Sequence, residues 1–183
     1  MPKATARDSD QVVAAARGGD PAAFEALVRA NADAVYGHAV RFFGDPQTAE
    51  DATQEVFIKV YRSISGFDGR SSFKTWLFRL TRNTCIDMMR RAARRPTPMD
   101  PLEMPQPATG DIAEDVVAGA ALEQAVATLP PEDRDALNAV TLFGLSYEDA
   151  GTALSIPAGT VKSRVFRARR TLLSLLGLTK REA

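Results

Sequence analysis

The sequence predicts an all-α protein in which two small helical domains are joined by a flexible, acidic, proline-rich linker. Apolar residues recur at helical spacing in both halves of the 183-residue chain, and no alternating run bounded by turn residues predicts a strand. Residues 96–107 contain five of the eleven prolines, which lack a backbone donor and fix φ. We therefore place domains at residues 1–95 and 118–183, with the linker at 96–117.

Two Asp-Pro pairs and a glycine-rich break organise the first domain. Asp20-Pro21 and Asp45-Pro46 each place an N-cap before a proline at the first helical position, so each predicts a helix start. Apolar residues then recur at helical spacing: Phe24, Leu27, Val28, Val35, Ala39 and Phe42, followed by Val56, Val60, Tyr61 and Ile64. The break at residues 66–69 precedes a third helix, whose apolar stripe comprises Phe73, Trp76, Leu77, Leu80, Thr84 and Met88.

The second domain ends in a helix-turn-helix pattern. Ser146 and Asp149 form a capping-box start for a short helix, which residues 155–160 interrupt. A longer basic helix is predicted from about Thr160 to Leu176. At about 100° per residue, this helix has a narrow apolar stripe, formed by Val161, Val165, Ala168 and Leu172.

The opposite face of the long helix indicates nucleic-acid recognition. It carries cations, a hydroxyl group and an aromatic ring: Lys162, Ser163, Phe166, Arg167 and Arg170. Solubility accounts for exposed arginines but not for an exposed phenylalanine, whose ring suits a thymine methyl group or a base edge in the major groove. We therefore interpret this helix as a recognition helix.

Charge is segregated along the chain, although the formal net charge is zero. Residues 1–95 carry 15 basic and 11 acidic side chains, residues 96–130 carry 6 acidic and no basic ones, and residues 131–183 carry 8 basic and 6 acidic ones. Two basic segments around an acidic middle are typical of a polyanion-binding protein; solvated helix faces are the alternative.

Several classes of protein are not expected. The single cysteine cannot form an internal disulfide or a Cys₄ zinc site, and no apolar run is long enough to span a bilayer. No signal-peptide apolar region begins the chain, so we expect a cytoplasmic protein without membrane insertion. We expect no enzyme, metal site or cofactor, because Cys85 and His38 lie on different predicted helices and no phosphate-binding glycine loop is present. Cys85 is interpreted as a packing group and His38 as a partly exposed helix residue.

Two blocks of the sequence resemble regions 2 and 4 of a bacterial RNA polymerase sigma factor, of the extracytoplasmic-function (ECF, group 4) type in the sigma-70 family. Residues 23–95 resemble region 2, with the segments DATQEVF at 51–57 and FKTWLFRL at 73–80. Residues 129–176 resemble region 4, with GLSYED at 144–149 and GTVKSRVFRAR at 159–169. Both blocks occur in the family's order and cover most of the chain.

The resemblance implies a sigma factor that binds core RNA polymerase and directs promoter-specific transcription initiation. Region 2 would capture and melt the −10 element, and region 4 would read the −35 element in the major groove. Implied partners are core polymerase, promoter DNA and an anti-sigma factor. The alternative is a stand-alone helix-turn-helix transcriptional regulator that binds duplex operator DNA.

The resemblance also assigns roles to residues. Docking on the clamp helices of the largest polymerase subunit falls to Asp51, Gln54, Glu55 and Phe57. Contact with the −10 element, as a single strand, falls to Phe67, Arg70, Arg79, Arg82, Asn83, Arg90 and Arg91. Phe67 and the loop after it would form a base pocket, Asn83 would bond a base edge and the arginines would hold phosphates. Contact with the −35 duplex falls to Thr160, Lys162, Ser163, Phe166, Arg167 and Arg170.

Two further features have two interpretations each. Trp76 lies on the apolar stripe of its helix, which favours core packing over base stacking. In this family the linker threads the RNA-exit path of the polymerase, so the acidic linker is either an electrostatic mimic of RNA or a solvated tether.

Overall fold

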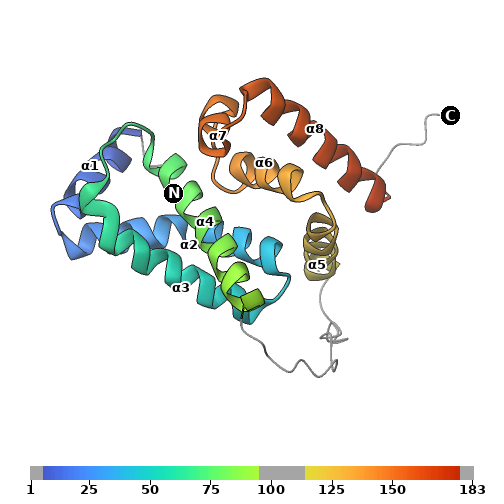
Figure 1. The fold of residues 1–183 in the computed structure, drawn as a ribbon, viewed down its shortest axis with the longest axis horizontal. Helices are drawn as coiled ribbons and strands as arrows, with labels where there is room; N and C mark the ends of the chain where they lie inside the picture. The colour runs from blue at the N-terminus through green and yellow to red at the C-terminus, as the bar shows by residue number, and fades with distance from the viewer. Residues whose placement is uncertain (1–5, 95–113, 178–183) are drawn as a thin grey trace.

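A computed structural model describes residues 6–94 and 114–177, and every regular element within these two ranges is helical (Figure 1). The all-α prediction is therefore confirmed. The first range forms α1 (Ala6–Arg17), α2 (Pro21–Phe43), α3 (Pro46–Ser63), the 3₁₀ turn η1 (Ile64–Gly66) and α4 (Phe73–Arg94). The second range forms α5 (Glu114–Ala127), α6 (Pro131–Thr141), α7 (Tyr147–Leu154) and α8 (Ala158–Leu175).

The three capping signatures begin helices as predicted. The carboxylate of Asp20 accepts hydrogen bonds from the backbone amides of Ala22 and Ala23 at the start of α2. Asp45 accepts from the amide and the hydroxyl of Thr48 at the start of α3, and these bonds lower the pKa of its carboxyl group. At α7 the Ser146 hydroxyl accepts from the Asp149 amide and donates to the Asp149 carboxylate. Each cap satisfies donors that an uncapped helix start leaves unpaired.

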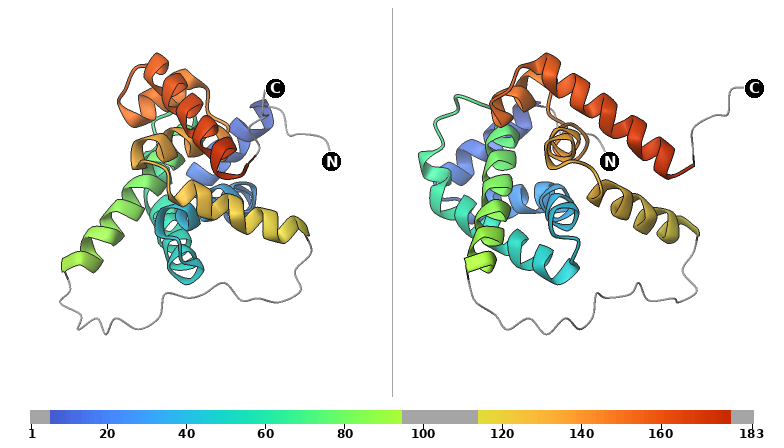
Figure 2. Two further views of the ribbon diagram at one scale, coloured as in Figure 1. Left: turned by 90° about the vertical axis from the view of Figure 1, so that its right-hand side faces the viewer. Right: turned by 45° about the vertical axis from the view of Figure 1, so that its right-hand side comes forward.

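In the first domain α2, α3 and α4 pack around an apolar core, and α1 closes the end near η1 (Figures 1 and 2). The predicted stripes supply its buried residues, among them Leu27, Val35, Val56, Val60 and Leu77. Trp76 packs, half-buried, against this core, which agrees with the packing interpretation. Tyr61 is an exception: its side chain is 69% exposed.

In the second domain α6, α7 and α8 form the predicted helix-turn-helix with one supporting helix. The buried residues of α8 are the predicted stripe, Val161, Val165, Ala168 and Leu172. Ser155 takes the left-handed conformation at the end of α7, with φ of 58°. The carbonyl of Ile156 lies 2.7 Å from where a side chain at Gly151 would begin, so only glycine permits this tight turn.

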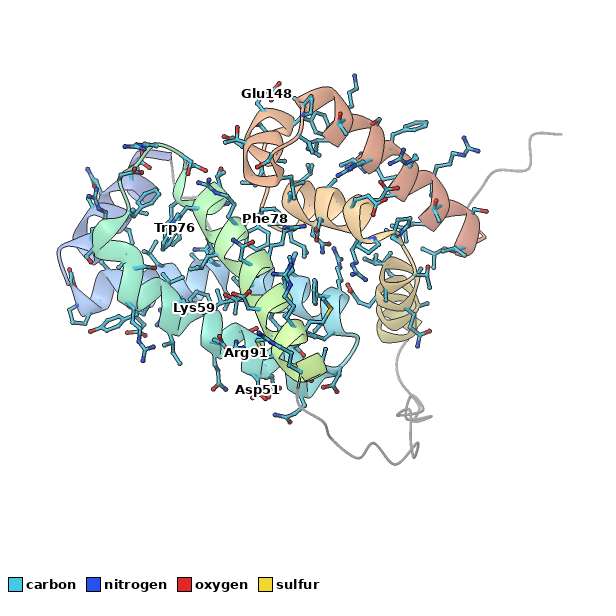
Figure 3. All side chains as sticks on the ribbon, viewed as in Figure 1. Asp51, Lys59, Trp76, Phe78, Arg91 and Glu148 are labelled. Atoms are coloured by element: carbon cyan, nitrogen blue, oxygen red, sulfur yellow. The ribbon has the colours of Figure 1, made fainter. Side chains whose placement is uncertain are left out.

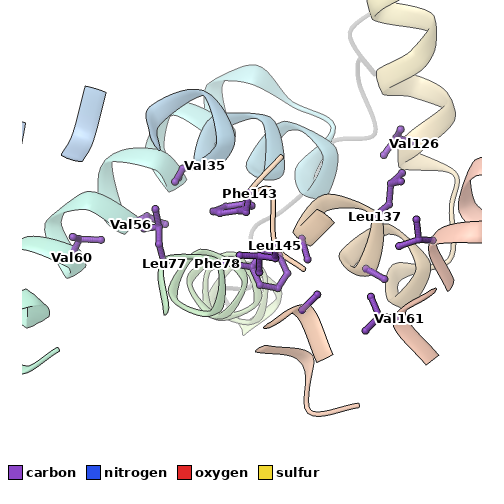
Figure 4. Packing of buried hydrophobic residues seen from close by; sticks show 14 of the residues in the cluster. Val35, Val56, Val60, Leu77, Phe78, Val126, Leu137, Phe143, Leu145 and Val161 are labelled. Atoms are coloured by element: carbon purple, nitrogen blue, oxygen red, sulfur yellow. The ribbon is translucent and has the colours of Figure 1, made fainter. Parts of the chain in front are cut away.

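The two domains pack directly against each other and share a core (Figure 4). Phe78 of α4 and Phe143 of the turn after α6 are fully buried, with ring centroids 5.2 Å apart in an edge-to-face arrangement. Leu142 packs on α2 at Gly37, where a Cβ atom would lie 3.5 Å from the leucine methyl groups. Packing between domains that a linker separates has no local signal, and the sequence did not predict it.

His38 lies at the centre of this contact, and the expectation that it is partly exposed is wrong. Its side chain is fully buried, with the Phe78 and Phe143 rings at 5.7 and 6.2 Å and Asn138 at 3.4 Å from its Nδ1. Phe143 and Asn138 belong to the second domain, about one hundred positions later in the chain. Periodicity within α2 therefore could not reveal the burial of His38.

The ends of the predicted linker differ in what the structure describes. Residues 114–117, assigned to the linker, form the first turn of α5. The remaining linker residues, 96–113, lie outside the described residues, and so do both interpretations of the acidic segment. None of the helices in the described ranges has the length and apolar character needed to cross a membrane.

Candidate polymerase and nucleic-acid interfaces

The residues assigned to polymerase docking divide between two environments on α3, the helix on which Figure 3 labels Asp51 and Lys59. Asp51 and Gln54 are exposed on successive turns. Phe57 is half-buried and packs against the core. Glu55 faces α4, where its Oε1 accepts from Nη2 of Arg91 at 2.6 Å and lies 3.2 Å from Nζ of Lys59. Burial raises the pKa of Glu55, but hydrogen bonds from these two cations outweigh it, so the net pKa is lowered.

The exposed stripe of α3 continues beyond the assigned residues. Ile58 is 49% exposed and Tyr61 is 69% exposed, and they follow Gln54 at helical spacing. The face therefore changes from polar at Asp51 to apolar at Tyr61. The sequence did not single out Ile58 and placed Tyr61 in the core, because both lie close to buried valines along the chain.

A cavity of about 580 Å³ adjoins the loop that precedes α4. Phe67, Arg70, Ser71, Ser72 and Phe73 line it, together with α1 residues and Asp149 of α7. The predicted pocket residue Phe67 is only 7% exposed, because its ring packs on Phe73 and Trp76 with centroids 6.2 and 5.4 Å away. Phe67 thus supplies the wall of the cavity, and the polar loop supplies its rim.

Most of the arginines assigned to the −10 strand already have polar partners in this structure. Arg70 pairs with Asp68, Arg79 donates to the Ser71 hydroxyl and Arg91 pairs with Glu55. Arg82 is committed to the second domain, where its Nε donates to Oδ2 of Asp135 at 2.6 Å. Asn83 and Arg90 are exposed on α4. The structure therefore brings these side chains to one helix and its preceding loop.

The residues assigned to the −35 duplex lie along α8. Five of them are exposed, as predicted: Lys162, Ser163, Phe166, Arg167 and Arg170. Phe166 is 67% exposed and lines a hollow of about 350 Å³ with Tyr147 and Lys162. Thr160 is half-buried, its amide donates to the Pro157 carbonyl, and its own carbonyl accepts from the Ser163 hydroxyl. An aromatic ring among cations on a helix-turn-helix suits the edge of a duplex groove.

Two acidic residues of α6, which the sequence did not single out, hold two of the predicted DNA-binding arginines. Asp133 holds Arg167 of α8 through two hydrogen bonds, and Asp135 holds Arg82 of α4. Residues two positions apart on a helix point to nearly opposite sides, so α6 directs one carboxylate to each neighbouring helix. The bond to Asp133 raises the pKa of Arg167. The sequence signal that could have indicated these pairs is the cluster of Glu132, Asp133 and Asp135 around Arg134.

The two groups considered for catalysis are buried apart. Burial lowers the pKa of His38 to about 4, although the negative charge of Asp135 opposes this shift. Burial raises the pKa of Cys85 to about 12, and this thiol packs among Ala39, Ala49 and Ala52 as predicted. Both groups are therefore neutral at pH 7. Across the described residues no cluster of three His, Cys, Asp or Glu side chains is placed to hold a metal ion.

Comparison with known proteins agrees with this arrangement. Residues 27–95 match the family described as Sigma-70 region 2, and residues 119–172 match Sigma-70, region 4. The chain is 35% identical to the RNA polymerase sigma-H factor of Pseudomonas aeruginosa, over 98% of this chain and 99% of that protein. It is 40% identical to the ECF RNA polymerase sigma factor SigE of Mycolicibacterium smegmatis, over 86% of this chain and 64% of that protein.

A solved structure shares the arrangement of helices. It is the sigma factor RpoE in complex with the anti-sigma factor NepR from Bartonella quintana, with 26% identity and a TM-score of 0.67. The match covers 86% of this chain and 98% of that one. These likenesses favour a promoter-directing sigma factor over a stand-alone regulator. The chain therefore belongs to the extracytoplasmic-function group of the sigma-70 family of RNA polymerase sigma factors.

Proposed function

We propose that this sigma factor carries core RNA polymerase to promoters through three surfaces, on α3, on α4 with its preceding loop, and on α8. The observation that carries the proposal is the face of α8, where Phe166 is two-thirds exposed between cations on a helix-turn-helix. Water solvates cations readily but not a phenyl ring, so this face suits a partner with apolar and anionic parts. A DNA major groove at the −35 element has both.

For polymerase docking we assign Asp51 and Gln54 to direct contact with the clamp helices of the largest subunit. Both side chains are exposed on the outer face of α3. Glu55 pairs with Arg91 of α4 and Phe57 packs against the apolar core, so we assign both to holding α3 in place within the domain. The polar-to-apolar stripe that ends at Tyr61 suits a helix-on-helix interface.

For the −10 element we assign a single strand that crosses α4 and enters the cavity beside Phe67. The cavity volume of about 580 Å³ is ample for one extruded base, and its rim has hydroxyl groups and Arg70. Asn83 and Arg90 are exposed on α4 for a base edge and a phosphate. In the present arrangement Asp149 of α7 lines the same cavity, so a strand that enters it passes beside the second domain.

For the −35 element we assign duplex DNA to α8. Lys162 and Arg170 lie on the exposed face and suit phosphates, while Ser163 and Phe166 suit base edges. The Ser163 hydroxyl donates to the Thr160 carbonyl, so its oxygen remains an acceptor for a base amino group. We place Thr160 beside a backbone phosphate.

We also propose regulation by an anti-sigma factor. The structural relative from Bartonella quintana is bound to one, and it shares the helix arrangement of this chain. The apolar end of the α3 stripe, Ile58 and Tyr61, is an exposed apolar surface that suits such a partner.

Run-off transcription tests the proposal. Purified full-length chain is combined with core RNA polymerase on a promoter fragment, and on fragments in which either the −10 or the −35 element is scrambled. Transcripts that require the chain and both elements support the proposal. Sequence-specific footprinting of duplex DNA by the chain without polymerase would instead support the stand-alone regulator.

Two variants locate the surfaces. Asn83→Ala should weaken discrimination among −10 base substitutions while leaving −35 preference intact, because Asn83 lies on α4 and not on α8. Asp51→Arg should weaken polymerase binding in a pull-down without changing the fold, because Asp51 is exposed. Unchanged behaviour of both variants would contradict the assignments.

A further inference from the structure

Arg167 of α8 and Asp133 of α6 form a two-pronged ion pair. Nη2 of Arg167 lies 2.7 Å from Oδ1 of Asp133, and Nε lies 3.1 Å from Oδ2. Two parallel hydrogen bonds between a guanidinium and one carboxylate fix the plane of the guanidinium as well as its position. The orientation of Arg167 is therefore set by α6.

The two partners differ sharply in exposure. The Asp133 side chain is 6% exposed, whereas the Arg167 side chain is 60% exposed. Asp133 is the third residue of α6, where the helix dipole favours a negative charge. The anchor is thus held inside the domain, and the arginine that it grips projects from the predicted DNA-facing side of α8.

The pairing leaves a useful edge of the guanidinium uncovered. Arginine has five N–H donors, and Asp133 uses one on Nε and one on Nη2. Both hydrogens on Nη1 and the second on Nη2 remain. The pair formed by Nη1 and Nη2 matches N7 and O6 of guanine, the commonest specific contact in the major groove.

Arg167 differs in this respect from the other cations on the exposed face of α8. Among the described residues, neither Lys162 nor Arg170 has an ion-pair partner within 4.0 Å. Mobile cations suit phosphates, whose contacts carry no sequence information directly. A cation with a fixed plane suits a base edge, because two parallel hydrogen bonds require it.

We propose that Asp133 is a positioning residue for −35 readout: it presents the free edge of Arg167 to a guanine of the promoter. The inference rests on the proposed role of α8 and adds to it a residue outside the helix-turn-helix pair. Fixing Arg167 before DNA arrives removes part of the cost of ordering a long side chain on binding. It also makes the arginine selective, because a rotated guanidinium would accept other bases.

A competing role for the same contact predicts the opposite effect. If Asp133 only neutralised Arg167 in the absence of DNA, its removal would free a cation and strengthen DNA binding without sequence preference. If Asp133 positions Arg167, its removal lowers the preference for guanine.

The experiment measures base preference rather than activity alone. Full-length chain is assembled with core polymerase, and binding is measured on promoters carrying each of the four bases at every −35 position. The variants are Asp133→Ala, Asp133→Asn and Arg167→Ala, with the double variant of Asp133→Ala and Arg167→Ala. Glu132→Gln is the matched control, because it removes an exposed acidic charge from the same turn of α6.

We expect Asp133→Ala to lower the ratio of guanine to non-guanine affinity by about fivefold or more at one −35 position. Asp133→Asn retains one acceptor of similar size, so it should fall between wild type and Asp133→Ala, and it preserves the test if the alanine variant fails to fold. In the Arg167→Ala background the Asp133→Ala change should have no further effect on the ratio. Glu132→Gln should leave the ratio unchanged.

Three results would overturn the inference. They are an unchanged ratio in both Asp133 variants, a further loss of preference when Asp133→Ala is added to Arg167→Ala, and tighter binding with unchanged preference. A wild-type holoenzyme without any −35 base preference would overturn the proposed role of α8 itself. These failures are therefore distinguishable.

Discussion

Arg82 on α4 and Asp135 on α6 join the two domains through a hydrogen bond of 2.6 Å from Nε to Oδ2. Asp135 is buried, and Arg82 is about one-third exposed. Beside them Arg41 of α2 donates to both carboxylate oxygens of Glu123 and to Oδ1 of Asn138. The contact between the domains therefore consists of an aromatic centre surrounded by arginine-carboxylate pairs.

Arg82→Ala should lower the free energy of unfolding by about 2 kcal/mol, because it leaves the Asp135 carboxylate buried without its cation. The value is set below that of a fully buried pair, since water reaches Arg82 and screens the interaction. Urea unfolding followed by circular dichroism measures it. Arg90→Ala, on the exposed part of the same helix, is the control and should change stability by less than about 0.5 kcal/mol. Equal effects of both variants would contradict the prediction.

Stability should fall as the pH drops from about 6.5 to 4, because His38 stays neutral in the folded chain. The unfolded chain binds a proton to His38 below its ordinary pKa of 6.5, whereas burial holds the folded pKa at about 4. The charged groups near the ring are Asp135, which favours protonation, and Arg134, Arg82 and Arg41, which oppose it. The depressed pKa corresponds to roughly 3 kcal/mol of stability that is present at pH 7 and lost at low pH.

Urea titrations at pH 7, 6, 5 and 4 test this pH dependence. In His38→Gln the decline between pH 6.5 and 4.5 should largely disappear, since glutamine does not titrate. Asp45 and Glu55 also have lowered pKa values. The stability that they contribute is lost at lower pH, where each carboxylate is protonated. A decline of the same slope in wild type and variant would show that His38 is not its source.

The Cys85 thiol should resist alkylation in the folded chain at pH 8. Burial raises its pKa to about 12, so almost none of the reactive thiolate forms, and helix packing excludes the reagent. Labelling by iodoacetamide, followed by mass spectrometry, should be at least about a hundredfold slower than in 8 M urea. Comparable rates in both conditions would mean that the α2–α4 packing around Cys85 opens readily.

Phe166→Ala should abolish most −35-dependent transcription while changing the free energy of unfolding by less than about 0.5 kcal/mol, because the ring is exposed and contributes little to the core. Leu173→Ala is the control, as it removes an exposed apolar side chain two turns further along α8. The measurements are run-off transcription on promoters with intact and scrambled −35 elements, and thermal unfolding. A destabilised Phe166→Ala protein, or one with full −35 preference, would refute the assignment.

Neighbouring residues in the sequence predicted the helices and their caps. They did not predict the contacts between the two domains, which join residues far apart in the chain. Asp20, Asp45 and Ser146 act through hydrogen bonds within three residues, so their caps can be read from neighbouring positions. The exposed face of α8 was predictable because the helical period alone separates it from the buried stripe. The burial of His38 and the capture of Arg82 depend on residues about 50 to 100 positions away, which no periodicity encodes.

The buried contact between Phe78 and Phe143 makes separation of the two domains energetically unfavourable. Separation of the domains would expose both phenyl rings to water, at a free-energy cost that grows with the apolar surface exposed. A chain whose domains separate to bind both promoter elements would thus need another apolar surface to cover those rings. The packing that holds the two domains together in the isolated chain therefore makes their separation depend on a binding partner.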